Sequence, residues 1–149
     1  AVARRVAAPA VLDERARPRH VGAVLRGDAV CEGWITGGLG RPWGPVIVGE
    51  PAIGLVRPFK VAVGVIGTSA IEADGTRRDC DTREVRVAEA IMQHARTVYL
   101  VTDHSKVGRP ALVRQGHLSQ VHALFTDKPL PPEMADTVAA AGTQVYVAE

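Results

Sequence analysis

Short apolar runs rich in β-branched residues alternate with helical patterns along most of this chain. The runs are nearly continuous rather than alternating with polar positions, which is typical of strands that are covered on both faces. They lie at residues 29–36, 60–66, 97–102, 121–126 and 143–148. Strand, helix and strand in repetition predict an α/β fold with a mainly parallel open sheet and flanking helices.

Helical periodicity is clearest in two stretches. One covers residues 82–95, with Asp81 placed to cap its start, and the other covers residues 130–141, with Gly142 placed to end it. A shorter helix is expected at residues 50–56. The residues on the expected buried stripes are Val85, Ala88, Met92 and Ala95 in the first helix and Leu130, Met134, Val138 and Ala141 in the second.

The composition is that of a single globular domain. The 149 residues are 46% apolar and 23% charged, and the net charge of +2 is too small for a nucleic-acid-binding face. No apolar run is long enough to span a membrane, and two cysteines are too few for a disulfide scaffold, so a cytoplasmic location is expected. Opposite charges intermix in one region, which predicts a solvated cluster of Arg77, Arg78, Arg83 and Arg86 with Asp79, Asp81 and Glu84.

The loops after the apolar runs are the candidate sites, because ligands in parallel α/β sheets bind beyond the carboxyl ends of the strands. After the first run, Gly37 and Gly38 let backbone N–H groups approach an anion, and Arg41 can hold a phosphate or carboxylate with two hydrogen bonds. The alternative is a flexible turn. The spacing is not that of a P-loop or a dinucleotide-binding loop, so no cofactor is expected.

Two further loops carry polar groups. Gly67 and the hydroxyl of Thr68 follow the second run, where a ligand contact and a turn with local hydrogen bonds both fit the sequence. Ser105 and Lys106 follow the third run, and a lysine in this place suits a phosphate, although an ordinary polar turn has the same composition. No metal site is expected.

Six short segments, taken in order, resemble the sequence motifs of a known protein family. They are TGG at 36–38 with RP at 41–42, VG at 48–49, VAVGVIGTSA at 61–70, the helix that contains Glu84, DHSKVG at 103–108, and LFTD at 124–127 followed by LPP at 130–132. With the final GTQVYVA, they resemble the effector domain of DeoR-type bacterial transcriptional regulators over roughly residues 30–149, while residues 1–28 match poorly.

The resemblance implies a non-catalytic sensor whose fold is similar to that of ribose-5-phosphate isomerase. Its effector would be a phosphorylated sugar or a similar small molecule, and the protein, expected to be a repressor, would form a homo-oligomer. DNA would be bound only through a winged helix-turn-helix that is absent from this chain. The ligand-binding residues that the resemblance implies are Gly37, Gly38, Arg41, Gly67, Thr68, Glu84, Ser105 and Lys106.

The chain also departs from the family's pattern. The strings D-x-G-T-T and T-N-S that open the family's domain are missing, which implies either a chain truncated at its N-terminus, ahead of these strings, or an N-terminal part that has diverged. The family's helix lysine falls on Ala88, and the aspartate of its V-D-G string falls on Ile66. Two alternatives stay open. One is a sugar-phosphate isomerase of similar fold, whose carboxylate base has no match in the IGTSA loop, and the other is a dimerisation module that binds no ligand.

Overall fold

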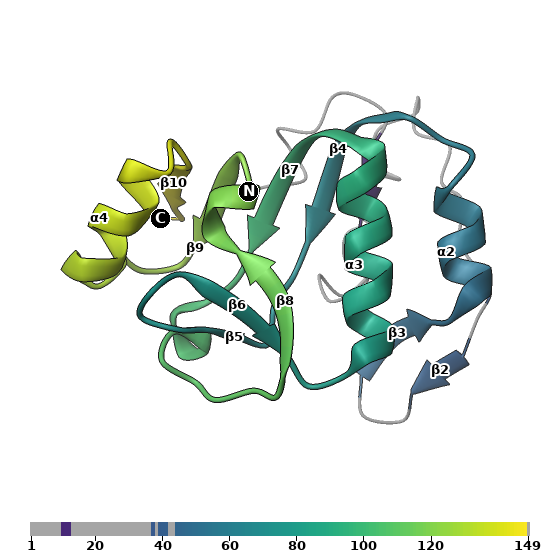
Figure 1. Cartoon of the computed structure of the whole chain (residues 1–149), viewed down its shortest axis with the longest axis horizontal. Coiled ribbons are helices and arrows are strands. Elements are labelled where there is room, and N and C mark those ends of the chain that lie inside the picture. Colours follow the sequence, from purple (N-terminus) through teal and green to yellow (C-terminus); the bar gives the residue numbers. More distant parts are fainter. Residues whose placement is uncertain (1–9, 13–36, 38, 42–43, 149) are drawn as a thin grey trace.

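A parallel β-sheet forms the centre of the computed structural model, which describes residues 10–12, 37, 39–41 and 44–148 (Figure 1). Its strands lie in the order β1-β4-β7-β9-β10, and every neighbouring pair is parallel. They are β1 (Ala10–Leu12), β4 (Val61–Ile66), β7 (Ala95–Val101), β9 (Ala123–Thr126) and β10 (Gln144–Val147). The predicted α/β fold with a mainly parallel sheet is confirmed.

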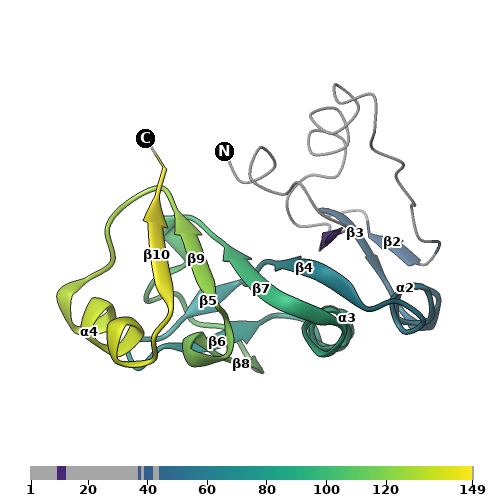
Figure 2. The same ribbon diagram turned by 90° about the horizontal axis from the view of Figure 1, so that it is seen from above.

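The α-helices of the described residues lie on the same side of this sheet, as Figure 2 shows. They are α2 (Glu50–Val56), α3 (Thr82–His94) and α4 (Pro132–Ala140). The apolar core lies between the helices and the sheet. Its fully buried side chains include Leu100 and Leu124 from the sheet, Ile91 from α3 and Val138 from α4.

Local sequence explains where α3 begins and how closely it packs. The Asp81 carboxylate accepts a hydrogen bond from the Arg83 backbone N–H at 2.8 Å and thereby caps the helix. Gly64 lies in β4 beneath the helix, where a Cβ atom would come within 2.8 Å of Ile91 Cγ2. Because a glycine stands there, α3 lies close against the sheet.

Two small antiparallel sheets accompany the parallel one. In the first, β2 (Leu39–Arg41) pairs with β3 (Gly44–Val48). In the second, β6 (Thr76–Asp79) lies between β5 (Ala70–Ile71) and β8 (Val113–His117). The sequence did not predict the second sheet, because β6 reads TRRD and β8 reads VRQGH, without the apolar pattern of a strand.

Most of the predicted elements are confirmed. The strands expected at 60–66, 97–102, 121–126 and 143–148 are β4, β7, β9 and β10, and the expected helices are α2, α3 and α4. The strand expected at 29–36 lies outside the described residues. Within the glycine-rich loop, part of what was expected to be a turn is instead strand β2.

Three expectations about burial were wrong. Ala141 is exposed because α4 ends one residue before it, so it does not continue the buried stripe. Arg77 and Asp79, expected in a solvated cluster, are both 0% exposed, because β6 is packed between β5 and β8. Arg83 does face solvent, and it forms an ion pair with Asp81 at 2.8 Å.

Candidate functional site

The carboxyl ends of three neighbouring strands bring the candidate loops to one edge of the sheet. β4 ends at Ile66, β7 at Val101 and β9 at Thr126, and because these strands are parallel, the loops that follow them are neighbours. Figure 1 shows the arrowheads of β4 and β7 pointing towards the end of the molecule at which α3 begins. Glu84, in the first turn of α3, therefore belongs to the same end.

The loop after β4 is held from inside the protein. The Gly67 carbonyl oxygen accepts a hydrogen bond from Gln115 Nε2 at 3.1 Å. The Thr68 side chain is only 5% exposed, and its hydroxyl lies 3.0 Å from the Arg78 carbonyl oxygen and 3.1 Å from that of Ala70. Since the single O–H is used within the protein, Thr68 has only its oxygen lone pairs left for a ligand.

A buried arginine lies behind this loop. Arg77 Nη1 donates to Gln115 Oε1 at 3.2 Å, and Arg77 Nε donates to the His117 carbonyl oxygen at 3.3 Å. Burial lowers the pKa of Arg77 to about 10, which leaves the guanidinium charged at neutral pH. Because Gln115 bonds Arg77 with its oxygen and Gly67 with its nitrogen, the three residues form one connected unit, called the buried network below.

The loop after β7 turns through a short 3-10 helix, η3 (His104–Lys106). The Asp103 carboxylate accepts a hydrogen bond from the Ser105 backbone N–H at 2.9 Å and caps this turn. The side-chain hydrogen bond with Ser105 is the main cause that lowers the pKa of Asp103, and the charge of Lys106 lowers it further. Ser105 is exposed and Lys106 is half-buried, so the turn presents a hydroxyl and an ammonium group next to each other.

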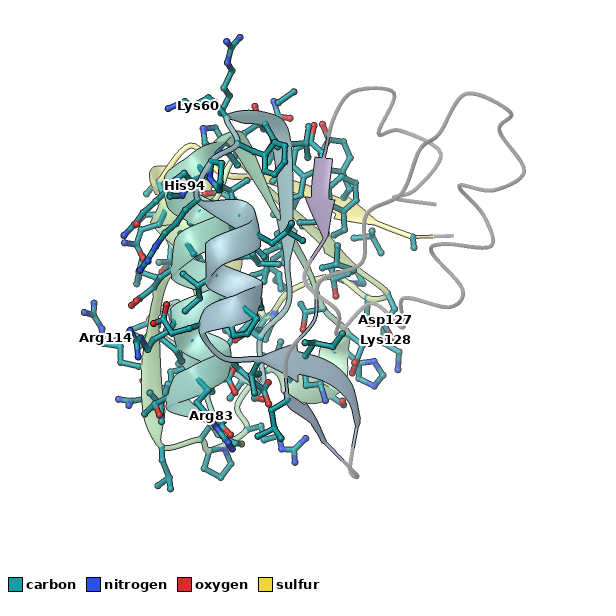
Figure 3. The ribbon with its side chains drawn as sticks, turned by 90° about the vertical axis from the view of Figure 1, so that its right-hand side faces the viewer. Lys60, Arg83, His94, Arg114, Asp127 and Lys128 are labelled. Atoms are coloured by element: carbon teal, nitrogen blue, oxygen red, sulfur yellow. The ribbon has the colours of Figure 1, made fainter. Side chains whose placement is uncertain are left out.

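The loop after β9 holds this turn in place. Asp127 Oδ1 accepts a hydrogen bond from the His104 backbone N–H at 2.6 Å, and Oδ2 accepts one from His104 Nδ1 at 2.6 Å. The bond from the imidazole lowers the pKa of Asp127 to about 2, so this carboxylate is ionised at neutral pH. Lys128 Nζ lies 3.4 Å from the other ring nitrogen, Nε2. Figure 3 shows Asp127 and Lys128 together, far from His94.

A cavity of about 210 Å³ opens beside this pair. It is lined by His104, Val107, Thr126, Lys128, Pro129, Leu130 and Pro131. The lining places an imidazole and an ammonium group beside apolar walls. Such a site suits a small molecule with an anionic group and an apolar or neutral remainder.

A second cavity, of about 320 Å³, is lined by residues of β7, β9 and β10 and of the loops beside them. Its walls include the stacked rings of Phe125 and Tyr146, whose centroids are 4.9 Å apart, and Tyr99 at 5.3 Å from Phe125. None of the described residues that line it is a lysine or an arginine. The cavity of about 210 Å³ is therefore the better candidate for an anionic ligand, despite its smaller volume.

Comparison with known families decides the class of this molecule. A sequence profile of the DeoR C-terminal sensor domain matches residues 19–128, which include the loops after β4, β7 and β9. The chain belongs to this family. It is a family of sensor domains and not of enzymes, so the expectation of a non-catalytic protein is confirmed and the isomerase alternative is set aside.

Several curated relatives are transcriptional repressors. The glycerol-3-phosphate regulon repressors of Escherichia coli and Haemophilus influenzae are 42% and 46% identical over 85 and 80 residues, which cover 57% and 54% of this chain and 34% and 31% of theirs. The HTH-type transcriptional repressor CsqR of Escherichia coli is 40% identical over 113 residues, 76% of this chain and 43% of its own. The sensor domain thus spans less than half the length of these relatives.

Four of the predicted site residues lie at the carboxyl edge of the sheet in this sensor domain. Gly67 and Thr68 lie in the loop after β4, and Ser105 and Lys106 lie on the turn after β7. No ion pair between Lys106 and another described residue is found. Its ammonium group is thus free of direct carboxylate contacts within the described part of the chain.

The remaining predicted residues come from other elements. Glu84 lies in the first turn of α3 and is half-buried. Gly37 is exposed, and Arg41 lies on β2, whose partner β3 contacts α3. Gly38 lies outside the described residues.

Sequence reasoning missed the residues that join the loops. Asp127 and Lys128 directly follow β9, so the rule that selected Lys106 applies to them as well. The sequence did not identify Gln115 and Arg77 as residues that hold the loops, because they lie on strands without an apolar pattern.

Within the described ranges, no group of three histidine, cysteine, aspartate or glutamate side chains is arranged to hold a metal ion. None of the helices described in this structure has the length and apolar character needed to cross a bilayer.

Proposed function

We propose that this domain senses a phosphorylated sugar or a related phosphate-bearing metabolite for a DeoR-type transcriptional repressor. The observation that carries the proposal is the family match, which runs through the turn that holds Lys106 at the carboxyl edge of β7. The names of two relatives, which refer to a glycerol-3-phosphate regulon, favour a small phosphate ester. A lysine on a capped turn beside a cavity is the type of group that recognises phosphate.

The binding residues of this proposal are those that the sequence selected. Lys106 and Arg41 neutralise the phosphate, the hydroxyl of Ser105 donates to it, and Glu84 accepts a hydrogen bond from a sugar hydroxyl. Gly67 and Thr68, together with Gly37 and Gly38, supply backbone groups and a close approach.

The effect on transcription follows from linkage. An effector that binds one arrangement of a homo-oligomer more tightly than another shifts the population of the two. In this proposal, the arrangement sets the spacing of the repressor's DNA-binding domains, and a two-fold operator calls for a symmetric protein.

Calorimetry and thermal unfolding of the 149-residue chain with a panel of phosphate monoesters test the proposal. The panel contains sn-glycerol 3-phosphate and several sugar phosphates, each paired with its unphosphorylated form. We expect at least one phosphate ester to bind and to raise the melting temperature, while its unphosphorylated partner binds poorly. A folded chain that binds none of them would instead be a dimerisation module without a ligand.

A further inference from the structure

Five ionisable side chains meet where the loops after β7 and β9 touch. They are Asp103, His104 and Lys106 from the first loop and Asp127 and Lys128 from the second, and together they are called the edge cluster. The cluster contains two carboxylates and two ammonium groups, so its net charge is zero as long as His104 is neutral. Protonation of His104 is what gives the described part of this site a positive charge.

The partners of His104 show where its proton lies. Nδ1 is 2.6 Å from an oxygen of the ionised Asp127 carboxylate, which can only accept, so Nδ1 carries a hydrogen. Nε2 is 3.4 Å from the ammonium group of Lys128, which can only donate, so Nε2 offers its lone pair. This is the arrangement of a neutral imidazole held between a carboxylate and an ammonium group.

An anion in the adjacent cavity changes the role of Nε2. Both His104 and Lys128 line that cavity of about 210 Å³. Phosphate oxygens are acceptors, so they pair with Lys128 Nζ but are repelled by a nitrogen lone pair. When Nε2 takes up a proton, both nitrogens donate charge-assisted hydrogen bonds to oxygens of one phosphate, and the anion offsets the repulsion between the two cations.

We infer that His104 and Lys128 together bind the phosphate group of the effector and that His104 takes up one proton when they do. The inference rests on the proposed function, because it requires a phosphate-bearing ligand, and it adds two binding residues to that site. The proton comes from solvent and ends on Nε2, and no bond of the ligand breaks. Affinity therefore rises as the pH falls, since the complex holds more protons than the free protein.

Proton counting by calorimetry tests the inference directly. The 149-residue chain is titrated with sn-glycerol 3-phosphate, or with the tightest binder of the panel, at about pH 7.5, where a phosphate ester with a second pKa near 6 is almost fully dianionic. Any proton taken up then goes to the protein. Titrations in two buffers of different ionisation enthalpy give the number, and we expect about one proton per ligand bound.

Substitutions at His104 and Lys128 identify the residues responsible. His104→Asn keeps a donor near the position of Nδ1 for Asp127 but removes Nε2, so proton uptake should vanish and affinity should fall about tenfold or more. Lys128→Met should lower the affinity, because the phosphate then loses one of its two cationic donors. His94→Asn is the matched control: His94 bonds the Ala90 carbonyl within α3, far from Lys128 (Figure 3), and both readouts should stay unchanged.

Imidazole NMR provides a readout that does not depend on affinity. The ring nitrogens of His104 should report the neutral Nδ1–H form in the free chain and the imidazolium in the complex. An imidazolium in the free chain at this pH would overturn the inference.

The two proposals fail in different ways. If a phosphate ester binds without proton uptake, or binds His104→Asn as tightly as the unsubstituted chain, the inference is wrong while the proposed function stands. If no phosphate monoester binds the folded chain, the proposed function fails and the inference fails with it.

Discussion

The buried network and the edge cluster both hold loops at the same edge of the sheet, and they use charge in opposite ways. In the buried network, the guanidinium of Arg77 is 0% exposed and is held by neutral oxygens of Gln115 and of the backbone. In the edge cluster, half-exposed His104 donates a hydrogen bond to half-exposed Asp127 at 2.6 Å, with an ammonium group nearby.

The difference shows a division of roles. A buried charge with neutral partners is costly to disturb, since each lost hydrogen bond leaves a polar group without water. Exposed charges are weakly coupled to stability and remain available to a ligand. We therefore expect changes in the buried network to alter folding, and changes in the edge cluster to alter binding.

The largest effect is expected from Arg77→Ala. Truncation removes a fully buried side chain and leaves Gln115 Oε1 without its donor, so the free energy of unfolding should fall by about 3 kcal/mol. Arg77→Met keeps most of the packing but also leaves Gln115 Oε1 without its donor, so it should cost less, about 2 kcal/mol. Urea unfolding measures the loss of unfolding free energy in both variants. Equal losses would show that the packing of the Arg77 side chain contributes less to this free energy than its hydrogen bonds do.

Lys106→Met, at the edge of the sheet, is expected to alter ligand binding rather than folding. A charge-assisted hydrogen bond to phosphate is worth about 1.5–3 kcal/mol, so the affinity for a phosphate ester should fall about tenfold to a hundredfold. Stability should stay nearly unchanged, because the side chain is half-buried and forms no ion pair with another described residue. Calorimetry with the tightest-binding phosphate ester measures the affinity of both proteins. Equal affinity of the folded variant and the unsubstituted chain would show that Lys106 is not part of the site.

A smaller effect is expected at Ser69, in the loop after β4 and two residues beyond Gly67 of the buried network. Ser69 Oγ donates to Asp79 Oδ1 at 3.3 Å, a long and partly buried bond. Ser69→Ala should therefore lower the free energy of unfolding by about 0.5–1 kcal/mol, measured by urea unfolding. A loss as large as that of Arg77→Ala would mean that the loop itself, rather than the network behind it, holds this edge together.

The smallest effect on stability is expected from Asp127→Asn, because Asp127 is exposed, and it should depend on pH. The pKa of Asp127 is lowered from 3.8 to about 2 in the folded chain, so its ionised form stabilises the fold above pH 3.8, and this contribution is lost as the pH falls to about 2. The stability difference between the two chains should shrink across that window. Urea midpoints measured through it provide the check, and a constant difference would contradict the assignment.

The parallel sheet and its helices were predictable because their signals are local. β4, β7 and β9 are apolar runs, and Asp81 and Gly142 mark helix ends within a few positions. Strand β6 was not predictable, since Arg77 is buried only because Gln115 and His117 accept its hydrogen bonds from 38 and 40 positions away. A charged sequence becomes a buried strand when distant residues supply the acceptors.

The candidate site was predictable in part for the same reason. The turn with Ser105 and Lys106 follows a recognisable strand, so its position came from the pattern alone. The bond between His104 and Asp127 spans 23 positions and depends on β7 and β9 being neighbours in the sheet. Strand order, which periodicity does not reveal, decides which loops share a site.

The order of the strands has a consequence for how the chain folds during synthesis. From β1 to β10, spatial order in the parallel sheet is the same as order along the chain. Each strand therefore finds its partner already made when it leaves the ribosome, and no strand must be inserted between two that have already paired. The sheet can grow at one side as translation proceeds, with few wrong pairings to undo.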